Sequence, residues 1–385
     1  MKAYITQIAN FLPNASVSND DIEKVLGQVG TRPSRTRRLV LDSNGIKARH
    51  YAIDPATGAP THTNAQLAAQ AVRRLQERSG VNLMADLSLL SCGSTSADQM
   101  IPSHGSMVHG ELGAAPCEVL SVAGACCTGT TALKYAAMAV TAGEHKRAVV
   151  TASELFSPLL RANHFAPELA ERVAALETNP SLAFEHDFLR WMLSDGAAAL
   201  LIEPEPIALG NMPALKIEWI ESLSFAGETE VCMYHLGSRS KKDGKLTSWK
   251  AVPDAAEWLK GGFFNIGQDA RLLSEQIGLV MKKGLQAAMK KHPMKADDID
   301  WLISHHSSNF FRAEVLKRIE EADLPIPSER VFTTLSEQGN IGSASAFLSL
   351  EALADQGKLK SGQKVLLFVP ESARFSFALA MLTVV

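Results

Sequence analysis

Two adjacent cysteines, Cys126 and Cys127, stand among small residues in the stretch S-V-A-G-A-C-C-T-G-T-T, directly before a helical pattern. A thiol at the start of a helix is well placed for nucleophilic chemistry, because unpaired backbone N–H groups and the positive end of the helix dipole favour a thiolate. The same N–H groups can hold a developing oxyanion. The alternative is that both cysteines are small buried hydrophobic residues, which is the commoner role of a free cysteine.

Three polar residues near the C-terminal end complete a possible reactive set. His305 and His306 follow the apolar run D-W-L-I-S, and Asn340 lies in the turn G-N-I-G-S-A-S. Because adjacent residues on a strand point to opposite faces, we expect only one of the two histidines to enter a given site. Taken singly, a structural histidine and a turn asparagine are simpler explanations.

The elements around these residues occur twice in the same order. The order is helix, strand, strand, small-residue turn, helix and strand, with the helices starting near Asn64 and Leu273. The turn before the second helix holds Cys126 in one half and Asn340 in the other. Two such halves, packed about a pseudo-twofold axis, would bring Cys126, His305 and Asn340 together as layered sheets covered by helices. The simpler explanation is that any α/β protein alternates helices and strands.

Composition excludes several classes of protein. The 385 residues carry a net charge of −3, which favours neither nucleic acid nor an anionic membrane as a partner. No apolar stretch reaches the length of a membrane span, and the first residues lack the shape of a signal peptide. Five cysteines form an odd set, which suits free thiols in the cytoplasm. The pairs Cys126-Cys127 and His305-His306 lack metal-ligand spacing, so we expect no metal site.

Six segments in order resemble the β-ketoacyl-acyl-carrier-protein synthase III group of thiolase-like condensing enzymes. They are L-P-N-A-S-V-S-N-D-D-I-E-K, G-I-K-A-R-H, the run P-S-H-G to V-A-G-A-C ending at Cys126, L-S-D-G-A-A-A-L-L-I, D-W-L-I-S-H and G-N-I-G-S-A-S. The resemblance implies a thiolase-like layered α-β-α-β-α fold built from two pseudo-repeated halves, residues 1–204 and 205–385. It implies insertions around 155–191 and 205–264, which we interpret as caps over an acyl pocket, a dimer contact or surface decoration.

The resemblance also assigns roles. Its register places the nucleophile on Cys126 and makes Cys127 a packed neighbour. The register of D-W-L-I-S-H selects His305, whereas an H-x-x-N match would select His306 with Asn309. Cys126 would take an acyl group from a thioester, and His305 and Asn340 would stabilise the enolate of a decarboxylating malonyl-type thioester. The backbone N–H groups of Cys126 and Ser372 would form the oxyanion hole.

The implied substrates and partners follow from the same family. They are acyl-coenzyme A or acyl-carrier-protein thioesters, the acyl carrier protein itself and a second copy in a homodimer, with no metal or redox cofactor. Two alternatives remain: an acyltransferase that passes the acyl group from the cysteine to an alcohol or amine, and a Cys-His-Asn hydrolase.

Two departures from the family pattern have consequences. Leu39 and Ser43 occupy the places of the Trp and Arg that clamp the adenine of coenzyme A, which favours a carrier-protein donor. A glycine-rich turn of the family reads V-P-E-S-A-R-F here. We expect Glu371 and Arg374 in that turn either to pair with each other or to act near the active site. We also expect His306 to be a neighbour of the active site. These departures suggest a specialised enzyme for an unusual acyl chain or a secondary metabolite.

Overall fold

The chain is described by a computed structural model that covers residues 2–29, 37–164, 189–210, 212–240 and 243–385. Most of the insertion expected around 155–191 lies outside these residues. No helix in the described ranges combines the length and the apolar character that a membrane span requires.

Ten strands form one continuous sheet whose two halves have the same construction. The first half has the order β1 (Tyr4–Phe11), β7 (Gly196–Glu203), β6 (Ala148–Glu154), β4 (Leu89–Ser94) and β5 (Glu118–Ala123). The second has the order β8 (Leu215–Ser224), β16 (Ser376–Val384), β15 (Lys364–Glu371), β13 (Trp301–Ser304) and β14 (Val331–Phe332). In both halves the first three strands are antiparallel and the last three are parallel. The repeated order expected from the sequence is therefore present.

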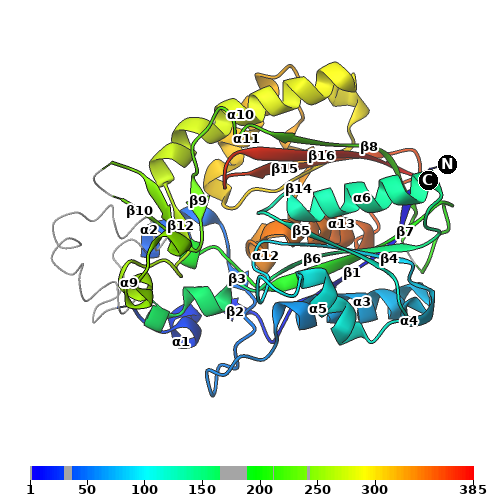
Figure 1. Cartoon of the computed structure of the whole chain (residues 1–385). Helices are drawn as coiled ribbons and strands as arrows, with labels where there is room; N and C mark the ends of the chain where they lie inside the picture. Colours follow the sequence, from blue (N-terminus) through cyan, green and yellow to red (C-terminus); the bar gives the residue numbers. More distant parts are fainter. Residues whose placement is uncertain (1, 30–36, 165–188, 211, 241–242) are drawn as a thin grey trace.

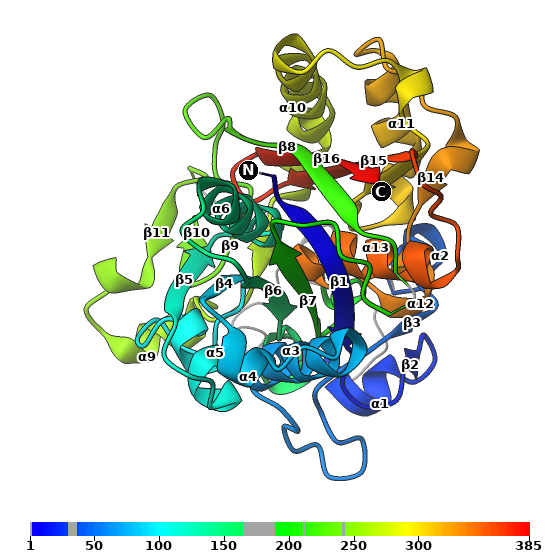
Figure 2. The same cartoon turned by 90° about the vertical axis from the view of Figure 1, so that its right-hand side faces the viewer.

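Helices cover both faces of each half and fill the space between them, as Figures 1 and 2 show. The central layer holds α6 (Thr128–Ala142) and α13 (Ser345–Asp355), which share one hydrophobic cluster with strands of both halves. One outer layer contains α3 (Asn64–Ser79) and α5 (His104–Leu112). The other contains α10 (Ala270–Lys291) and α11 (Arg312–Glu320). The layers therefore follow the order α-β-α-β-α.

Local sequence explains why the elements that carry the site begin and end where they do. Strands β4, β6 and β7 are buried along their whole length, which agrees with their continuous apolar or small residues. Helix α6 buries small residues such as Gly129, Ala132 and Ala136, so it fits between two sheets. It ends at Gly143, as expected, because the left-handed φ of 85° at that position suits glycine.

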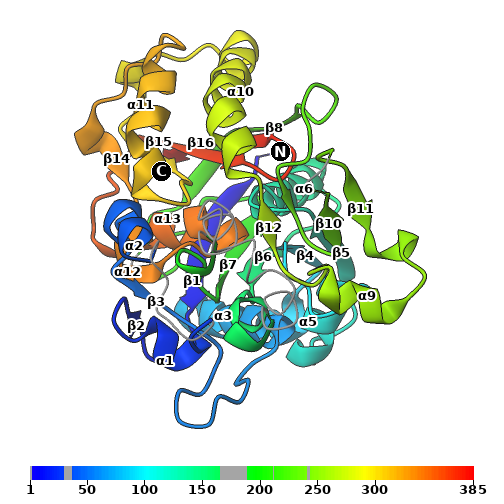
Figure 3. The same cartoon turned by 90° about the vertical axis from the view of Figure 1, so that its left-hand side faces the viewer.

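The remaining short elements lie around the edges of this core. They are β2 (Val17–Ser18), α1 (Ile22–Leu26), α2 (Arg37–Asn44), β3 (Ala48–Arg49), α4 (Leu83–Asp86), β9 (Met233–Tyr234), β10 (Gly237–Arg239), β11 (Leu246–Ser248), α9 (Ala255–Lys260), β12 (Gly267–Gln268) and α12 (Leu335–Gln338). Figure 3 shows β9 to β12 and α9 grouped beside the start of α10. Part of the insertion expected at 205–264 is core strand β8, and the part outside the sheet follows Ser224.

Candidate active site

The two adjacent thiols occupy different environments. Strand β5 ends at Ala123, and a short turn leads through Cys126 and Cys127 into α6. Cys127 is buried in the central cluster, and its thiol donates to the Val369 carbonyl at 3.2 Å. Cys126 is half-buried and lines a cavity. Of the pair, Cys126 is therefore the thiol that a ligand can reach.

Glycines allow the two halves to meet at this turn. A Cβ on Gly93 would lie 2.5 Å from the carbonyl carbon of Thr128, and a Cβ on Gly129 would lie 2.6 Å from the carbonyl oxygen of Ser343. Both contacts are with backbone, which cannot move aside as a flexible side chain can. The start of α6 thus packs directly on β4 of its own half and on the turn before α13 of the other.

The cavity beside Cys126 has a volume of about 50 Å³ and joins residues from distant parts of the chain. His305, His306 and Ser372 line it together with Cys126. Its apolar wall comes from one face of α10 and from the start of α11, through Leu273, Ile277, Met281, Phe311 and Val315. A thioester entering this cavity would meet an apolar passage that ends at a thiol.

Both histidines line this cavity, so the expectation that only one would do so was wrong. Strand β13 ends at Ser304, and the alternation of faces therefore does not extend to His305 and His306. Burial lowers the pKa of His305 to about 3 and that of His306 to about 4. Both rings are consequently neutral near pH 7, and each carries one N–H donor.

Asn340 is not among the residues that line this cavity. Its neighbours Gly339 and Ile341 line a second cavity of about 10 Å³, which also touches both histidines. Its side-chain oxygen accepts the backbone N–H of Gly342 at 2.9 Å. Its Nδ2 has no hydrogen-bond partner among the described residues, so the carboxamide keeps a donor for a ligand.

Two buried carboxylates surround the turn that carries Cys126. Glu371 accepts the backbone N–H of Cys127 at 3.2 Å and also interacts with the N–H of Ala125. Glu154, at the end of β6, accepts hydrogen bonds from Thr95, Ser96 and Ser343. Glu154 was not predicted from the sequence, although a charged residue at the end of a buried strand could have indicated a functional position.

Electrostatics at this turn favour the neutral thiol. Burial raises the pKa of the Cys126 thiol, and the charges of Glu371 and Glu154 raise it further. Burial also raises the pKa of both carboxyl groups. The helix N-terminus was expected to favour a thiolate, but Glu371 accepts the N–H of the N-cap residue Cys127, and its charge opposes that effect.

The remaining residues of interest lie in the turn that follows Glu371. Arg374 is exposed and donates to the Thr229 carbonyl at 3.3 Å, and the described residues contain no ion pair between it and Glu371. Arg374 therefore stands away from the cavity. The backbone N–H groups of Cys126 and Ser372 find no acceptor in another residue within the described ranges, so both are available to a ligand.

Comparisons with known proteins agree with this geometry. The family described as 3-oxoacyl-[acyl-carrier-protein (ACP)] synthase III C terminal matches residues 289–371, which include both histidines and Asn340. The chain is 24% identical over 363 residues to the beta-ketoacyl-[acyl-carrier-protein] synthase III of Methylococcus capsulatus, covering 94% of this chain and 93% of the relative. It is 24% identical over 369 residues to the synthase III of Sphingopyxis alaskensis, covering 95% and 94%. The chain is therefore similar to synthase III enzymes over almost its whole length, at low sequence identity.

Solved structures show that this synthase III-like chain has the fold of such enzymes. The synthase III (FabH) of Pseudomonas aeruginosa superposes with a TM-score of 0.70 at 17% identity, covering 100% of both chains. The tetronic acid condensing enzyme AbyA1 gives 0.72 at 18%, covering 99% of both chains. A variant of OleA from Xanthomonas campestris gives 0.74 at 21%, covering 100% of this chain and 97% of that one. The thiolase-like fold and the resemblance to synthase III enzymes expected from the sequence are confirmed, and the chain is a synthase III-like acyltransferase.

Proposed function

We propose that this acyltransferase joins two thioesters by decarboxylative condensation, with Cys126 as the residue that becomes acylated. The observation that carries the proposal is one cavity lined by a reachable thiol, a neutral histidine, and Cys126 and Ser372, whose backbone N–H groups have no acceptor in another of the described residues. This combination suits acyl transfer, which needs a nucleophile and donors aimed at the oxygen where charge develops.

In the first half-reaction the Cys126 sulfur attacks the carbonyl carbon of an acyl thioester. The N–H groups of Cys126 and Ser372 stabilise the oxygen of the tetrahedral intermediate. The bond to the departing thiol then breaks, and the proton of the Cys126 thiol ends on that departing thiol.

In the second half-reaction a malonyl-type thioester replaces the released thiol. His305 and the Nδ2 of Asn340 donate to its thioester carbonyl, so loss of CO2 leaves an enolate held by two neutral donors. The enolate carbon attacks the acyl group on Cys126, giving a 3-oxoacyl thioester and free Cys126. His306 faces the same cavity and is the alternative donor.

The acyl donor and the second subunit are also part of the proposal. Leu39 lies 70% exposed in α2, where an aromatic residue that could clamp adenine is missing, which favours an acyl-carrier-protein donor over coenzyme A. Strand β5 is an edge strand with partly exposed residues, beside Tyr135 and Met138 of α6, which are 37% and 60% exposed. An unprotected edge with nearby apolar side chains fits a homodimer formed along β5. Five free cysteines fit a cytoplasmic location.

Intact-mass measurement tests the proposal. The protein is incubated with a panel of acyl-coenzyme A and acyl-carrier-protein thioesters, alone and with malonyl-carrier protein. We expect a mass gain of one acyl group that disappears in Cys126→Ala and persists in Cys127→Ala, and CO2 release only when malonyl thioester is present. Acylation that survives Cys126→Ala would contradict the proposal. Free acid without CO2 would indicate a hydrolase, and malonyl-independent transfer to an alcohol or amine would indicate a simple acyltransferase.

A further inference from the structure

The hairpin turn between β15 and β16 has an unusual backbone at its last residue. The turn consists of Ser372, Ala373, Arg374 and Phe375, and Phe375 has a φ of 55°. A left-handed conformation is unfavourable for a residue with a side chain. Such a conformation persists only where surrounding structure imposes it, and it often marks a functional site. Ser372 of this turn lines the cavity with Cys126.

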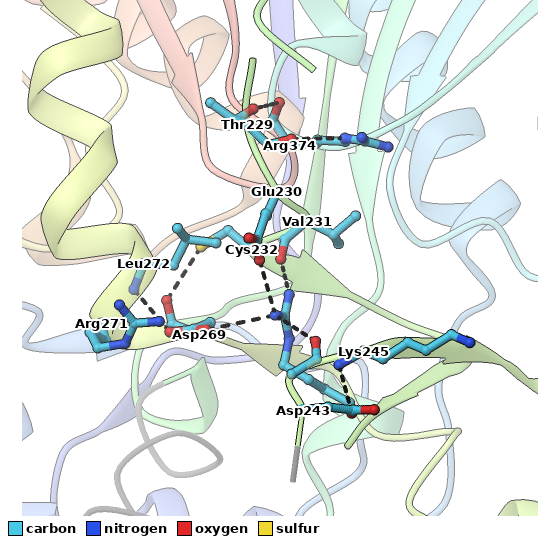
Figure 4. Close-up of polar contacts among 12 residues, drawn as sticks. Thr229, Glu230, Val231, Cys232, Asp243, Lys245, Asp269, Arg271, Leu272 and Arg374 are labelled. Carbon is cyan, nitrogen blue, oxygen red and sulfur yellow. Dashed lines mark hydrogen bonds and ion pairs between the residues drawn. The ribbon is translucent and has the colours of Figure 1, made fainter. Parts of the chain in front are cut away.

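The segment that follows β8, together with Gln268 of β12, makes hydrogen bonds to every residue of this turn. The backbone N–H of Phe225 donates to the Phe375 carbonyl at 3.0 Å, and the N–H groups of Cys232 and Met233 donate to the Ala373 carbonyl at 2.8 and 3.2 Å. The remaining contacts are reciprocal bonds between Thr229 and Arg374, both at 3.3 Å and visible in Figure 4, and a bond from Gln268 Nε2 to Ser372 Oγ at 2.9 Å. We call residues 225–233 together with Gln268 the buttress.

The buttress is itself fixed to the helix that forms the cavity wall. Strand β9 pairs with β12, which places Met233 opposite Gln268. The Asp269 N–H donates to the Cys232 carbonyl at 2.8 Å, and the buried Cys232 thiol donates back to the Asp269 carbonyl at 3.4 Å. Asp269 also caps α10 by accepting the Leu272 N–H at 2.9 Å, as Figure 4 shows. The turn, the buttress and the first turn of α10 therefore hold one another in place.

We propose that the buttress positions the Ser372 backbone N–H at Cys126, with Gln268 as a positioning residue that acts through the Ser372 side chain. This inference rests on the proposed acyl transfer. An oxyanion donor is effective only when its N–H lies at about 2.7 to 3.1 Å from the developing charge, so the position of the turn governs the rate. Gln268 is buried and directed at Ser372 Oγ, although it lies outside the cavity and touches no reacting atom.

The test measures single-turnover acylation of Cys126 in Gln268→Ala, Ser372→Ala and the double variant, with a thioester that acylates the wild type. Ser372→Ala keeps the backbone N–H and removes only the group that Gln268 holds. We expect each single variant to lower the acylation rate constant at saturating thioester about tenfold. The thioester concentration that gives half-saturation should stay within twofold of the wild-type value. The rate constant of the double variant should equal that of the single variants. Gln363→Ala, a glutamine at the opposite end of β15, is the matched control. A wild-type rate for Gln268→Ala, or effects that multiply in the double variant, would overturn the proposal.

Hydrogen exchange separates this inference from the proposed function. Peptides covering 371–377 should exchange about fivefold faster in Gln268→Ala, because that variant loses the hydrogen bond to Ser372 Oγ. If no thioester acylates the wild type but exchange changes as expected, the proposed function fails while the buttress stands as a structural brace. Unchanged exchange, or faster exchange with an unchanged acylation rate, would refute the positioning role.

Discussion

Replacing Gly129 with alanine tests the claim that the two halves must touch for the site to work. The new Cβ would lie 2.6 Å from the Ser343 carbonyl oxygen, 2.8 Å from the Ala152 Cβ and 3.0 Å from the Phe347 ring. Ordinary contact begins at 3.4 Å, so the start of α6 and the Ser343 backbone must separate by 0.8 Å, the difference from 2.6 Å. Glu154 accepts hydrogen bonds from both the N–H and the hydroxyl of Ser343, so the Ser343 backbone cannot shift easily.

The expected cost has two parts. Overpacking of this kind typically destabilises by about 1 to 3 kcal/mol, which the better helix propensity of alanine offsets by up to about 1 kcal/mol. A displacement near 1 Å of a reacting group typically lowers a rate by about a hundredfold. We therefore expect Gly129→Ala to lower the free energy of unfolding by about 0 to 2 kcal/mol. We expect its Cys126 to be acylated ten- to a hundredfold more slowly than in the wild type.

The assay combines urea unfolding with single-turnover intact-mass acylation. The control is Gly110→Ala in α5, where an added Cβ meets no atom within 4 Å among the described residues. The free energy of unfolding of that variant should rise by about 0.5 to 1 kcal/mol, and its rate of Cys126 acylation should stay within twofold of the wild-type rate. If Gly129→Ala acylates at the wild-type rate, close contact between the halves is not what positions Cys126.

Three further predictions address charge, pH and assembly. Glu371→Gln should increase the rate at which iodoacetamide alkylates Cys126 at pH 7, because removing the carboxylate charge lowers the thiol pKa; intact mass measures the rate. The free energy of unfolding should fall as pH drops below about 6.5, the unfolded histidine pKa, because folded His305 and His306 resist protonation down to pH 3 to 4. Between pH 7 and pH 5, the free energy of unfolding should fall by about 2 kcal/mol less in His306→Gln than in the wild type, as measured by urea unfolding at both pH values. Met138→Glu should yield monomers in analytical ultracentrifugation, because it places a charge beside the β5 edge.

Each of these predictions has an outcome that contradicts it. Slower or unchanged alkylation in Glu371→Gln would show that the carboxylate does not oppose the thiolate. An unchanged pH slope in His306→Gln would show that this ring is not held neutral by burial. Leu279→Glu, at a 50% exposed position on α10, is the control for Met138→Glu and should leave the assembly unchanged. Dimers in both variants would exclude β5 as the interface.

The fold and most of the residues that line the cavity could be predicted from the sequence, because those features depend on local sequence patterns. Helix α6 ends at Gly143 and follows a small-residue turn, so its start and its thiol could be located by register. The family resemblance placed Cys126, His305, Asn340 and Ser372 in one site, and the cavity is lined by all of these except Asn340. The assignment of catalytic roles to them stays a prediction.

What the sequence did not show depends on where a strand stops and on contacts between distant segments. Nothing in D-W-L-I-S-H-H indicates that β13 ends at Ser304, and this ending brings both histidines into the cavity. The sequence left open whether Arg374 pairs with Glu371 or acts near the active site, and it did not show that the side chain donates instead to Thr229, which is remote in sequence. Likewise, no pattern joins Gln268 to Ser372, since that bond depends on how β9 and β12 pair.

Each half of the chain holds the reactive turn of the other. Glu371 of β15 binds the N–H of Cys127, while the backbone of Asn340 bonds to Met192 and Ser194 before β7. A chain with only one half folded therefore has neither a fixed nucleophile nor a fixed carboxamide. Local opening of either half should abolish thioester consumption throughout the molecule, so that partly folded chains in a cell do not waste activated acyl groups.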